Sequence, residues 1–338
     1  MANAKEIQDR ISSIQDTMKI TKAMYMMSSM KLRKAKNRLA ETEPFFYGVQ
    51  EGIAETLSHF PNIQHIYFDN RPSDEQEDVK MHGYIVVTGD KGMAGAYNHN
   101  AIKLAIDRIG DPSREDYKLY VVGEVGRAFF VSQGYRVEED FRFSATKPSM
   151  HRARVITEKM VALYREGKLD RIDIIYTKMI NSVAQETCIE RLLPLKTHAF
   201  MKEKALEIKE DASGETKAAL ELQDSTKHVH NLNTFEYEAI TKGGNDFYTL
   251  YPSPERILSH LVYNYFTGFM YGALVESSAS EENSRMMAMQ SATDNAQSML
   301  NELSVEYNRV RQAAITQEIT EVVGGAKALR ANKKKKKK

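Results

Sequence analysis

Cysteine is almost absent from this chain of 338 residues, since Cys188 is the only one. A single cysteine excludes an intrachain disulfide and any redox or metal centre built on Cys-x-x-Cys spacing. Cys188 lies in the strand-like stretch TCIERLLPL, where a buried, inert thiol is more common than a catalytic nucleophile. The first residues, MANAKEIQDR, lack the apolar core of a signal peptide, so we expect a protein of a reducing, cytosolic compartment.

An excess of charge is also missing, because 47 basic residues face 46 acidic ones and the formal net charge is +1. Six of the basic residues are the last six, Lys333–Lys338, and without them 41 basic residues face 46 acidic ones. A mildly acidic body therefore carries a basic tail. A nucleic-acid binder has its positive charge spread over one face, so we expect no nucleic-acid partner.

The first 40 residues carry the periodicity of one long helix that is closed by Pro44. Apolar or small side chains recur in steps of four and three, as a heptad seam: Ile7, Ile11, Ile14, Met18, Thr21, Tyr25, Ser28, Leu32, Ala35 and Leu39. A heptad seam kept over about five repeats predicts a left-handed supercoil with a partner helix. Basic residues outnumber acidic ones nine to three between Met1 and Ala40.

The last 85 residues mirror the first with a second, longer seam. Ser253-Pro254 supplies an N-cap followed by proline at the first helical position, and no proline follows. A helix over 254–323 would be about 105 Å long, against about 55 Å for 3–40. The unmatched half, about 296–323, keeps apolar side chains that should not stand in water. We expect this half to sit inside something made by other chains.

Residues 257–275 contain no charged side chain and approach the length of a membrane span. Polar residues within the run, such as His260 and Asn264, favour packing against the protein's own body instead. The small seam residues Gly268, Gly272 and Ala279 predict a close approach of the partner helix.

Between the two helical ends lies an α/β region, at about 80–196. Strand-like runs at 82–88, 118–123, 171–177 and 187–193 alternate with helical patterns near 97–110, 124–133 and 149–167. Such alternation predicts βαβ units and a mainly parallel, Rossmann-like sheet. Two polar insertions interrupt it, at 69–80 and at about 202–246, and we interpret both as mobile surface segments.

The stretch GDKGMAGAYN after the first strand places Gly89, Gly92 and Gly95 three residues apart. A glycine-rich turn between strand and helix can cradle a phosphate, but this spacing matches neither phosphate-binding fingerprint. A tight turn is the favoured interpretation. The nine histidines show no metal-ligand spacing and no catalytic constellation stands out, so we expect neither cofactor nor metal, nor an active site of the chain's own.

A dense basic cluster, Lys31, Arg33, Lys34, Lys36 and Arg38, lies in the first helix. It fits a solvated flank of a coiled coil and a binding surface for an acidic protein equally well.

The two ends together resemble one known family. The opening MANAKEIQDRISSIQDTMKITKAMYMMSSMKLRKAK and the closing ESSASEENSRMMAMQSATDNAQSMLNELSVEYNRVRQAAITQEITEVVGGAKAL are similar to the ends of gamma subunits of F-type ATP synthases. The stretch TGDKGMAGAYN resembles the strand-turn motif of that family. The resemblance covers nearly the whole chain, and it departs at 202–246, at the lysine tail, and at Lys91 and Ala94, where the family often has Arg and Cys.

The resemblance implies a rotor subunit of the central stalk that couples ion flow to ATP synthesis or hydrolysis. Its paired terminal helices would be an antiparallel coiled-coil shaft, and its α/β domain the foot. The implied partners are the alpha and beta subunits, the epsilon subunit and the ring of c subunits. The chain itself would hold no catalytic residue, and it would lie peripherally on the cytoplasmic face of a bacterial plasma membrane.

The resemblance also assigns contacts with the beta subunit to eight residues: Lys22, Met24, Lys31, Arg33, Arg309, Arg311, Gln312 and Thr316. The expected division is an N-terminal coiled-coil helix (1–60), an α/β foot domain (80–200), a polar insertion that returns to the shaft (201–250), a long C-terminal coiled-coil helix (251–332) and a basic tail (333–338). Two alternatives stay open on the residues alone: a coiled-coil scaffold with a Rossmann-like domain, and a stand-alone nucleotide-binding enzyme.

Overall fold

The computed structural model describes residues 4–60, 63–68, 81–181, 184–196, 200, 251 and 253–335. The chain forms two compact units, one joining Met1–Met30 with Arg285–Lys338 and the other comprising Lys31–Ser284. We call them the terminal unit and the α/β unit. The predicted insertions 69–80 and 202–246 lie outside the described residues, as does the end of the lysine tail.

The α/β unit is built on a four-stranded sheet with the order β2-β1-β3-β4. The strands β1, β2 and β3 are parallel, and β4 is antiparallel to β3. Their bounds are His82–Val87 for β1, Tyr117–Val122 for β2, Arg171–Met179 for β3 and Gln185–Leu193 for β4. All four lie where the sequence predicts strands, and the expected mainly parallel sheet is confirmed.

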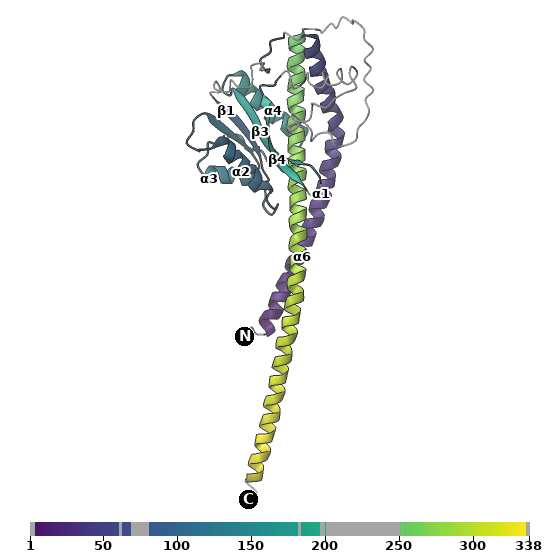
Figure 1. Cartoon of the computed structure of the whole chain (residues 1–338), viewed down its shortest axis with the longest axis vertical. Coiled ribbons are helices and arrows are strands. Elements are labelled where there is room, and N and C mark those ends of the chain that lie inside the picture. Colours follow the sequence, from purple (N-terminus) through teal and green to yellow (C-terminus); the bar gives the residue numbers. More distant parts are fainter. Residues whose placement is uncertain are drawn as a thin grey trace, which may run out of the picture. The chain divides into compact units, whose positions relative to one another are not determined.

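Three helices of the α/β unit also match the prediction: α2 (Tyr97–Ile109), α3 (Glu124–Ser132) and α4 (Met150–Arg165). Successive side chains of a strand point to opposite faces of the sheet. Tyr84 and Val86 of β1 join a core with α2 and α3, and Ile85 and Val87 join a second core with α4. Figure 1 shows α2 and α3 on one side of the sheet and α4 on the other. The sheet is therefore covered on both faces, as parallel sheets usually are.

The helix α1 (Ala4–His59) does not end at Pro44, so the predicted stop is wrong. Proline removes one helical hydrogen bond and crowds the preceding turn. Packing beyond it outweighs that local cost, because the ring of Phe46 stacks on Tyr265 with 5.1 Å between centroids. Val49 and Ile53 then enter the same core as α4.

The helix α6 (Pro254–Lys335) begins at the predicted N-cap, where the Ser253 hydroxyl accepts a hydrogen bond from the backbone N–H of Arg256 at 3.4 Å. It continues through Gly324 and Gly325, beyond the 254–323 stretch from which the helix length was estimated. A glycine in a helix costs about 1 kcal/mol relative to alanine and does not by itself break it.

The uncharged start of α6 packs on the α/β unit, as predicted. Leu258, Val262, Phe266 and Met270 are buried in the core that also contains α4. In the part of the chain that the structure describes, no helix combines the length and apolarity needed to cross a membrane.

Within the α/β unit, α1 and α6 run in opposite directions. The Lys31 ammonium lies 2.9 Å from a Glu282 carboxylate oxygen, and Gly52, further along α1, faces the earlier residue Leu261. Gly268 permits close approach, since a β-carbon there would lie 3.2 Å from the Phe46 ring, but the space around Gly272 is open and that part of the prediction is wrong. In the terminal unit the hydroxyls of Thr21 and Thr293 lie 2.8 Å apart.

Candidate partner-contact site

The far end of α6 is not covered by any other part of the chain that the structure describes. Every residue from Arg311 to Lys327 is exposed. The last buried seam residue is Leu300, so the uncovered part begins later than the predicted 296. Among the exposed side chains are four large aliphatic ones: Ile315, Ile319, Val322 and Val323. An apolar helix surface of this kind marks an interaction site.

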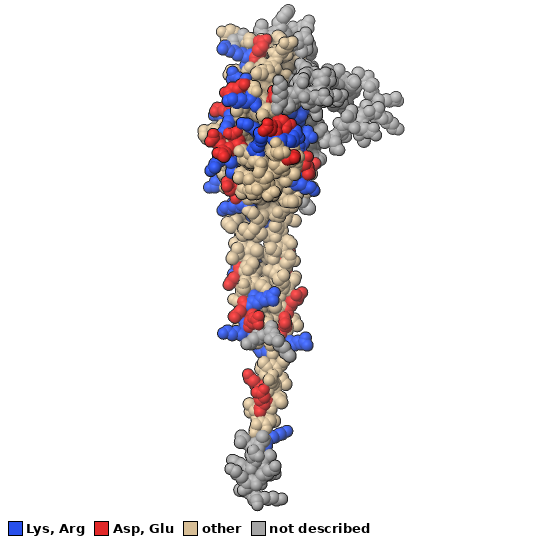
Figure 2. Space-filling model, turned by 90° about the vertical axis from the view of Figure 1, so that its left-hand side faces the viewer, with Lys and Arg blue, Asp and Glu red and all other residues tan. Residues whose placement is uncertain are grey.

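Three of the predicted contact residues lie on this exposed end of α6, which we call the α6 tip (residues 311–327), and Arg309 lies just before it. Arg309, Arg311 and Gln312 are exposed, and the Thr316 hydroxyl donates a hydrogen bond to the Gln312 carbonyl at 2.8 Å. Between 311 and 327 the only charged residues are Arg311, Glu318, Glu321 and Lys327. Figure 2 shows this end of the helix as mainly uncharged, with isolated acidic and basic side chains.

The other four predicted contact residues lie on α1, two of them in each unit. Lys22 and Met24 belong to the terminal unit, where Lys22 is exposed and Met24 is half-buried. Lys31 and Arg33 belong to the α/β unit and are both exposed. Lys31 also makes the ion pair with Glu282, which the sequence did not predict.

The glycine turn after β1 is a tight turn in the structure. The backbone N–H of Gly89 donates to the Asn98 side chain at 2.7 Å, and Gly95 has a left-handed φ of 55°. A β-carbon on Gly89 would lie 2.8 Å from a carboxylate oxygen of Glu281, so any larger residue here would displace that side chain of α6. A carboxylate beside the turn repels phosphate, which disfavours the nucleotide-binding alternative.

A family model described as ATP synthase matches residues 3–329. The chain is 40% identical to the "ATP synthase gamma chain" of Ruminiclostridium cellulolyticum, over 97% of this chain and 99% of that one. It is 35% identical to the "ATP synthase gamma chain, sodium ion specific" of Acetobacterium woodii, over 97% of this chain and 99% of that one. The chain belongs to the ATP synthase gamma chain family.

The fold agrees with that membership. A central stalk from the Tetrahymena thermophila mitochondrial ATP synthase aligns with a TM-score of 0.53 and 20% identity, over 81% of this chain and 99% of that one. A chain of the Euglena gracilis mitochondrial ATP synthase aligns with a TM-score of 0.51 and 18% identity, over 92% and 96%. The expected role as a central-stalk rotor subunit of an F-type ATP synthase is confirmed.

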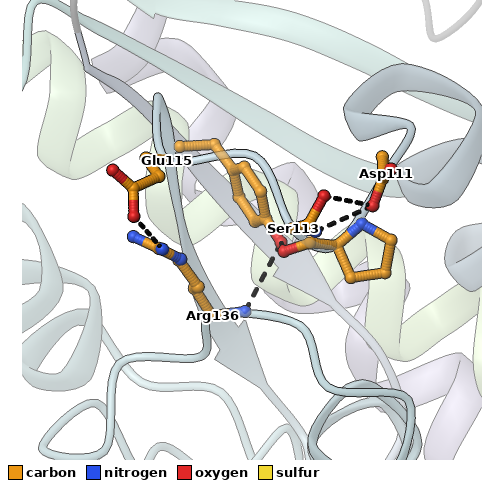
Figure 3. Close-up of polar contacts among 6 residues, drawn as sticks. Asp111, Ser113, Glu115 and Arg136 are labelled. Atoms are coloured by element: carbon orange, nitrogen blue, oxygen red, sulfur yellow. Dashed lines mark hydrogen bonds and ion pairs between the residues drawn. The ribbon is translucent and has the colours of Figure 1, made fainter.

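A shallow hollow lies on the α/β unit of this gamma chain, beside the start of β2. The close-up in Figure 3 shows Arg136 paired with Glu115 at 2.8 Å and its backbone N–H directed at the Tyr117 hydroxyl. The Tyr117 hydroxyl in turn donates to the Pro112 carbonyl at 3.0 Å. The side chains that line the hollow carry both signs of charge. Several of its polar groups bond to each other or to the loop before β2, so we interpret these contacts as stabilising that loop.

One ionisable cluster was missed by the sequence analysis. Glu276 of α6 is half-buried beside the end of β3, where it accepts a hydrogen bond from the backbone N–H of Met179 at 3.3 Å. Burial raises the pKa of Glu276 to about 7, against an opposing effect of the nearby Lys178. Burial likewise raises the pKa of Cys188 to about 12, which supports the prediction of an inert thiol.

Heptad spacing could not reveal the Glu276 cluster, because a charged residue next to a seam normally points to solvent. The only hint was the run of small polar residues that follows, SSAS at 277–280. Within the described residues, no three His, Cys, Asp or Glu side chains lie together as metal ligands.

Proposed function

We propose that this gamma chain is the non-catalytic shaft and foot of the rotor. In the proposal α1 and α6 form an antiparallel coiled coil, with the division 1–60, 80–200, 201–250, 251–332 and 333–338 as its parts. The α6 tip turns inside a ring of alternating alpha and beta subunits, which hold the ATP chemistry. The foot binds the epsilon subunit and the c-ring, at the cytoplasmic face of a bacterial plasma membrane.

The observation that carries the proposal is the exposed, weakly charged α6 tip. A helix with apolar side chains needs a cover, and the described residues supply none from Arg311 to Lys327. A rotor must not bind one angular position too tightly, and a surface with few fixed charges meets that need. The bacterial gamma chains among the relatives support the proposed location.

The contacts with beta are proposed for two places. Arg311, Gln312 and Thr316 on the tip would meet a loop of beta. Lys22, Met24, Lys31 and Arg33 on α1 would face acidic regions of beta, together with Arg309 on α6. Coulomb attraction is less directional than hydrogen bonding. Acidic regions of beta could therefore exert force on these basic side chains over a range of geometries.

Co-expression with alpha and beta subunits tests the proposal. We expect gel filtration to yield a complex of three alpha, three beta and one gamma chain with ATPase activity. Absence of such a complex would contradict the proposed function.

The residue assignment has its own test in the same complex. We expect Arg311→Gln to lower ATP-driven proton or sodium pumping more than ATP hydrolysis, because a contact that guides the tip is lost. Lys327→Gln is the matched control, since it removes one exposed positive charge from the same helix. Equal effects of the two changes would show that Arg311 has no specific contact.

A further inference from the structure

A short stretch of α6, Glu276–Ser284, is joined to the sheet by directional polar contacts. The Tyr97 hydroxyl, at the start of α2, lies 2.7 Å from the Ser277 hydroxyl. The Ser280 hydroxyl donates to the Thr177 carbonyl of β3 at 3.1 Å. Both hydrogen bonds join α6 to another element of the α/β unit, and all four residues are buried: Tyr97, Thr177, Ser277 and Ser280.

Two further contacts extend the same junction. The Gln185 amide, at the start of β4, donates a hydrogen bond to the Ser284 hydroxyl. At the other end, the backbone N–H of Met179 donates to Glu276. Three elements of the α/β unit (α2, β3 and β4) therefore bond to α6 within nine residues, or about 12 Å of helix.

The contacts all fall on one side of α6. At about 100° per residue, positions 276, 277, 280 and 284 lie within roughly a quarter of the helix circumference. Val275 and Ala279, which lie next to this arc on the helix, are buried apolar residues. The small side chains of Ser277, Ala279 and Ser280 bring the helix backbone close to the sheet, and Gly89 makes room for Glu281 in the same way.

Apolar packing and hydrogen bonding restrain this helix differently. An apolar seam holds two elements together but has several registers of similar energy, so one helix can shift past another by a turn. Hydrogen bonds require defined distances and angles, and a buried donor left without its partner is costly. The polar contacts thus fix both the rotation of α6 about its axis and its position along that axis.

We propose that Tyr97, Ser277, Ser280, Gln185 and Ser284 are positioning residues that form a torsional lock between α6 and the elements α2, β3 and β4, within the α/β unit. The lock rests on the proposed rotor function: torque applied to the foot turns the shaft without slip. The contacts end at Ser284, the last residue of the α/β unit.

The test uses the complex with alpha and beta, held on a surface by the hexamer. A bead is attached to the foot through Ser132→Cys, an exposed residue of α3, and the angular fluctuation of the bead is recorded while rotation is paused. The variant carries Tyr97→Phe, Ser277→Ala and Ser280→Ala. We expect its angular variance to rise by about two-fold, because directional restraints have been removed.

The matched control is Ser298→Ala with Ser304→Ala. These serines lie on the same helix, but their hydroxyls donate to the carbonyls of Asp294 and Leu300 one turn back. The control should leave the variance and the ratio of ions pumped per ATP unchanged, whereas the lock variant should pump fewer ions per ATP at a near-native hydrolysis rate.

The angular variance and the ions pumped per ATP distinguish a torsional lock from a role in folding alone. If the triple variant does not assemble, Tyr97→Phe and Ser280→Ala are measured singly, and each should still widen the angular distribution. Native variance in variants that assemble would overturn the inference while leaving the rotor function intact. Failure of the unaltered chain to form a rotating complex would instead count against the proposed function.

Discussion

At the scale of single residues, Glu276 shows how far burial can change a side chain that the sequence presents as ordinary. Its seam neighbours predicted a helix, and that prediction is confirmed. Its carboxyl group is partly enclosed because β3 ends and β4 begins against α6, and such a contact between distant segments leaves no trace in local periodicity. The eight predicted contact residues, by contrast, came from the family resemblance, and they stay a prediction.

The raised pKa of Glu276 predicts a pH-dependent stability. The folded state binds this proton more tightly than the unfolded state, so stability should fall as pH rises from about 4.5 to about 7. Glu276→Gln keeps an oxygen for the Met179 N–H and removes the charge. In urea unfolding at pH 8, we expect the free energy of unfolding of this variant to exceed that of the native protein by up to about 3 kcal/mol. Near pH 4.5 the two values should be nearly equal.

Glu302→Gln is the control for that experiment, because Glu302 is exposed on the same helix. It should leave the pH profile unchanged. Parallel profiles for native protein and Glu276→Gln would show that the carboxyl group is not enclosed as described.

At the scale of elements, local spacing predicted all four strands and five helices, and it failed where packing overrides a local penalty. Pro44 interrupts the hydrogen-bond ladder of α1, yet Phe46 and Val49 hold the helix beyond it on the core. The error at Gly272 has the opposite origin, because a small residue permits a close contact without requiring one. Local sequence therefore indicates which conformations and contacts an element permits, and packing against neighbouring elements determines which of them form.

Two glycines in the paired helices should respond differently to the same change. At Gly48 of α1 nothing lies within 4 Å of an added β-carbon, whereas at Gly268 of α6 the Phe46 ring lies at 3.2 Å. We expect Gly48→Ala to stabilise the α/β unit by about 0.5–1 kcal/mol, since glycine is the poorer helix former. Gly268→Ala should give a smaller gain or a loss. Equal shifts of the urea midpoint would contradict the packing at Gly268.

At the scale of the whole molecule, the α6 tip is exposed all along its length, and no other described part of the chain packs on it. A helix without tertiary packing is marginal in water, because helix stability in proteins comes mainly from packing of its apolar face. The α6 tip should therefore open readily in the isolated chain. Its order in the working enzyme would come from the ring of subunits around it.

Amide hydrogen exchange can test this expectation. In the isolated chain we expect fast exchange over residues 311–327 and slow exchange in β1 and β3, whose amides are buried in the sheet. Assembly with alpha and beta should slow exchange at the tip and leave the strands unchanged. A tip that is equally protected before and after assembly would show that the hexamer does not cover it.

The pairing of α1 with α6 has a consequence for synthesis of the chain on the ribosome. The contact between Thr21 and Thr293 can form only after a further 272 residues have been synthesised. At 5–20 residues per second, this delay is about 15–50 s. The core of α2 and α3 on their face of the sheet is complete once β4 has emerged, because it draws on residues 84–189 alone. Throughout this delay the apolar seam of α1 is exposed without its partner helix α6. The nascent chain should therefore be most prone to aggregation at its first helix.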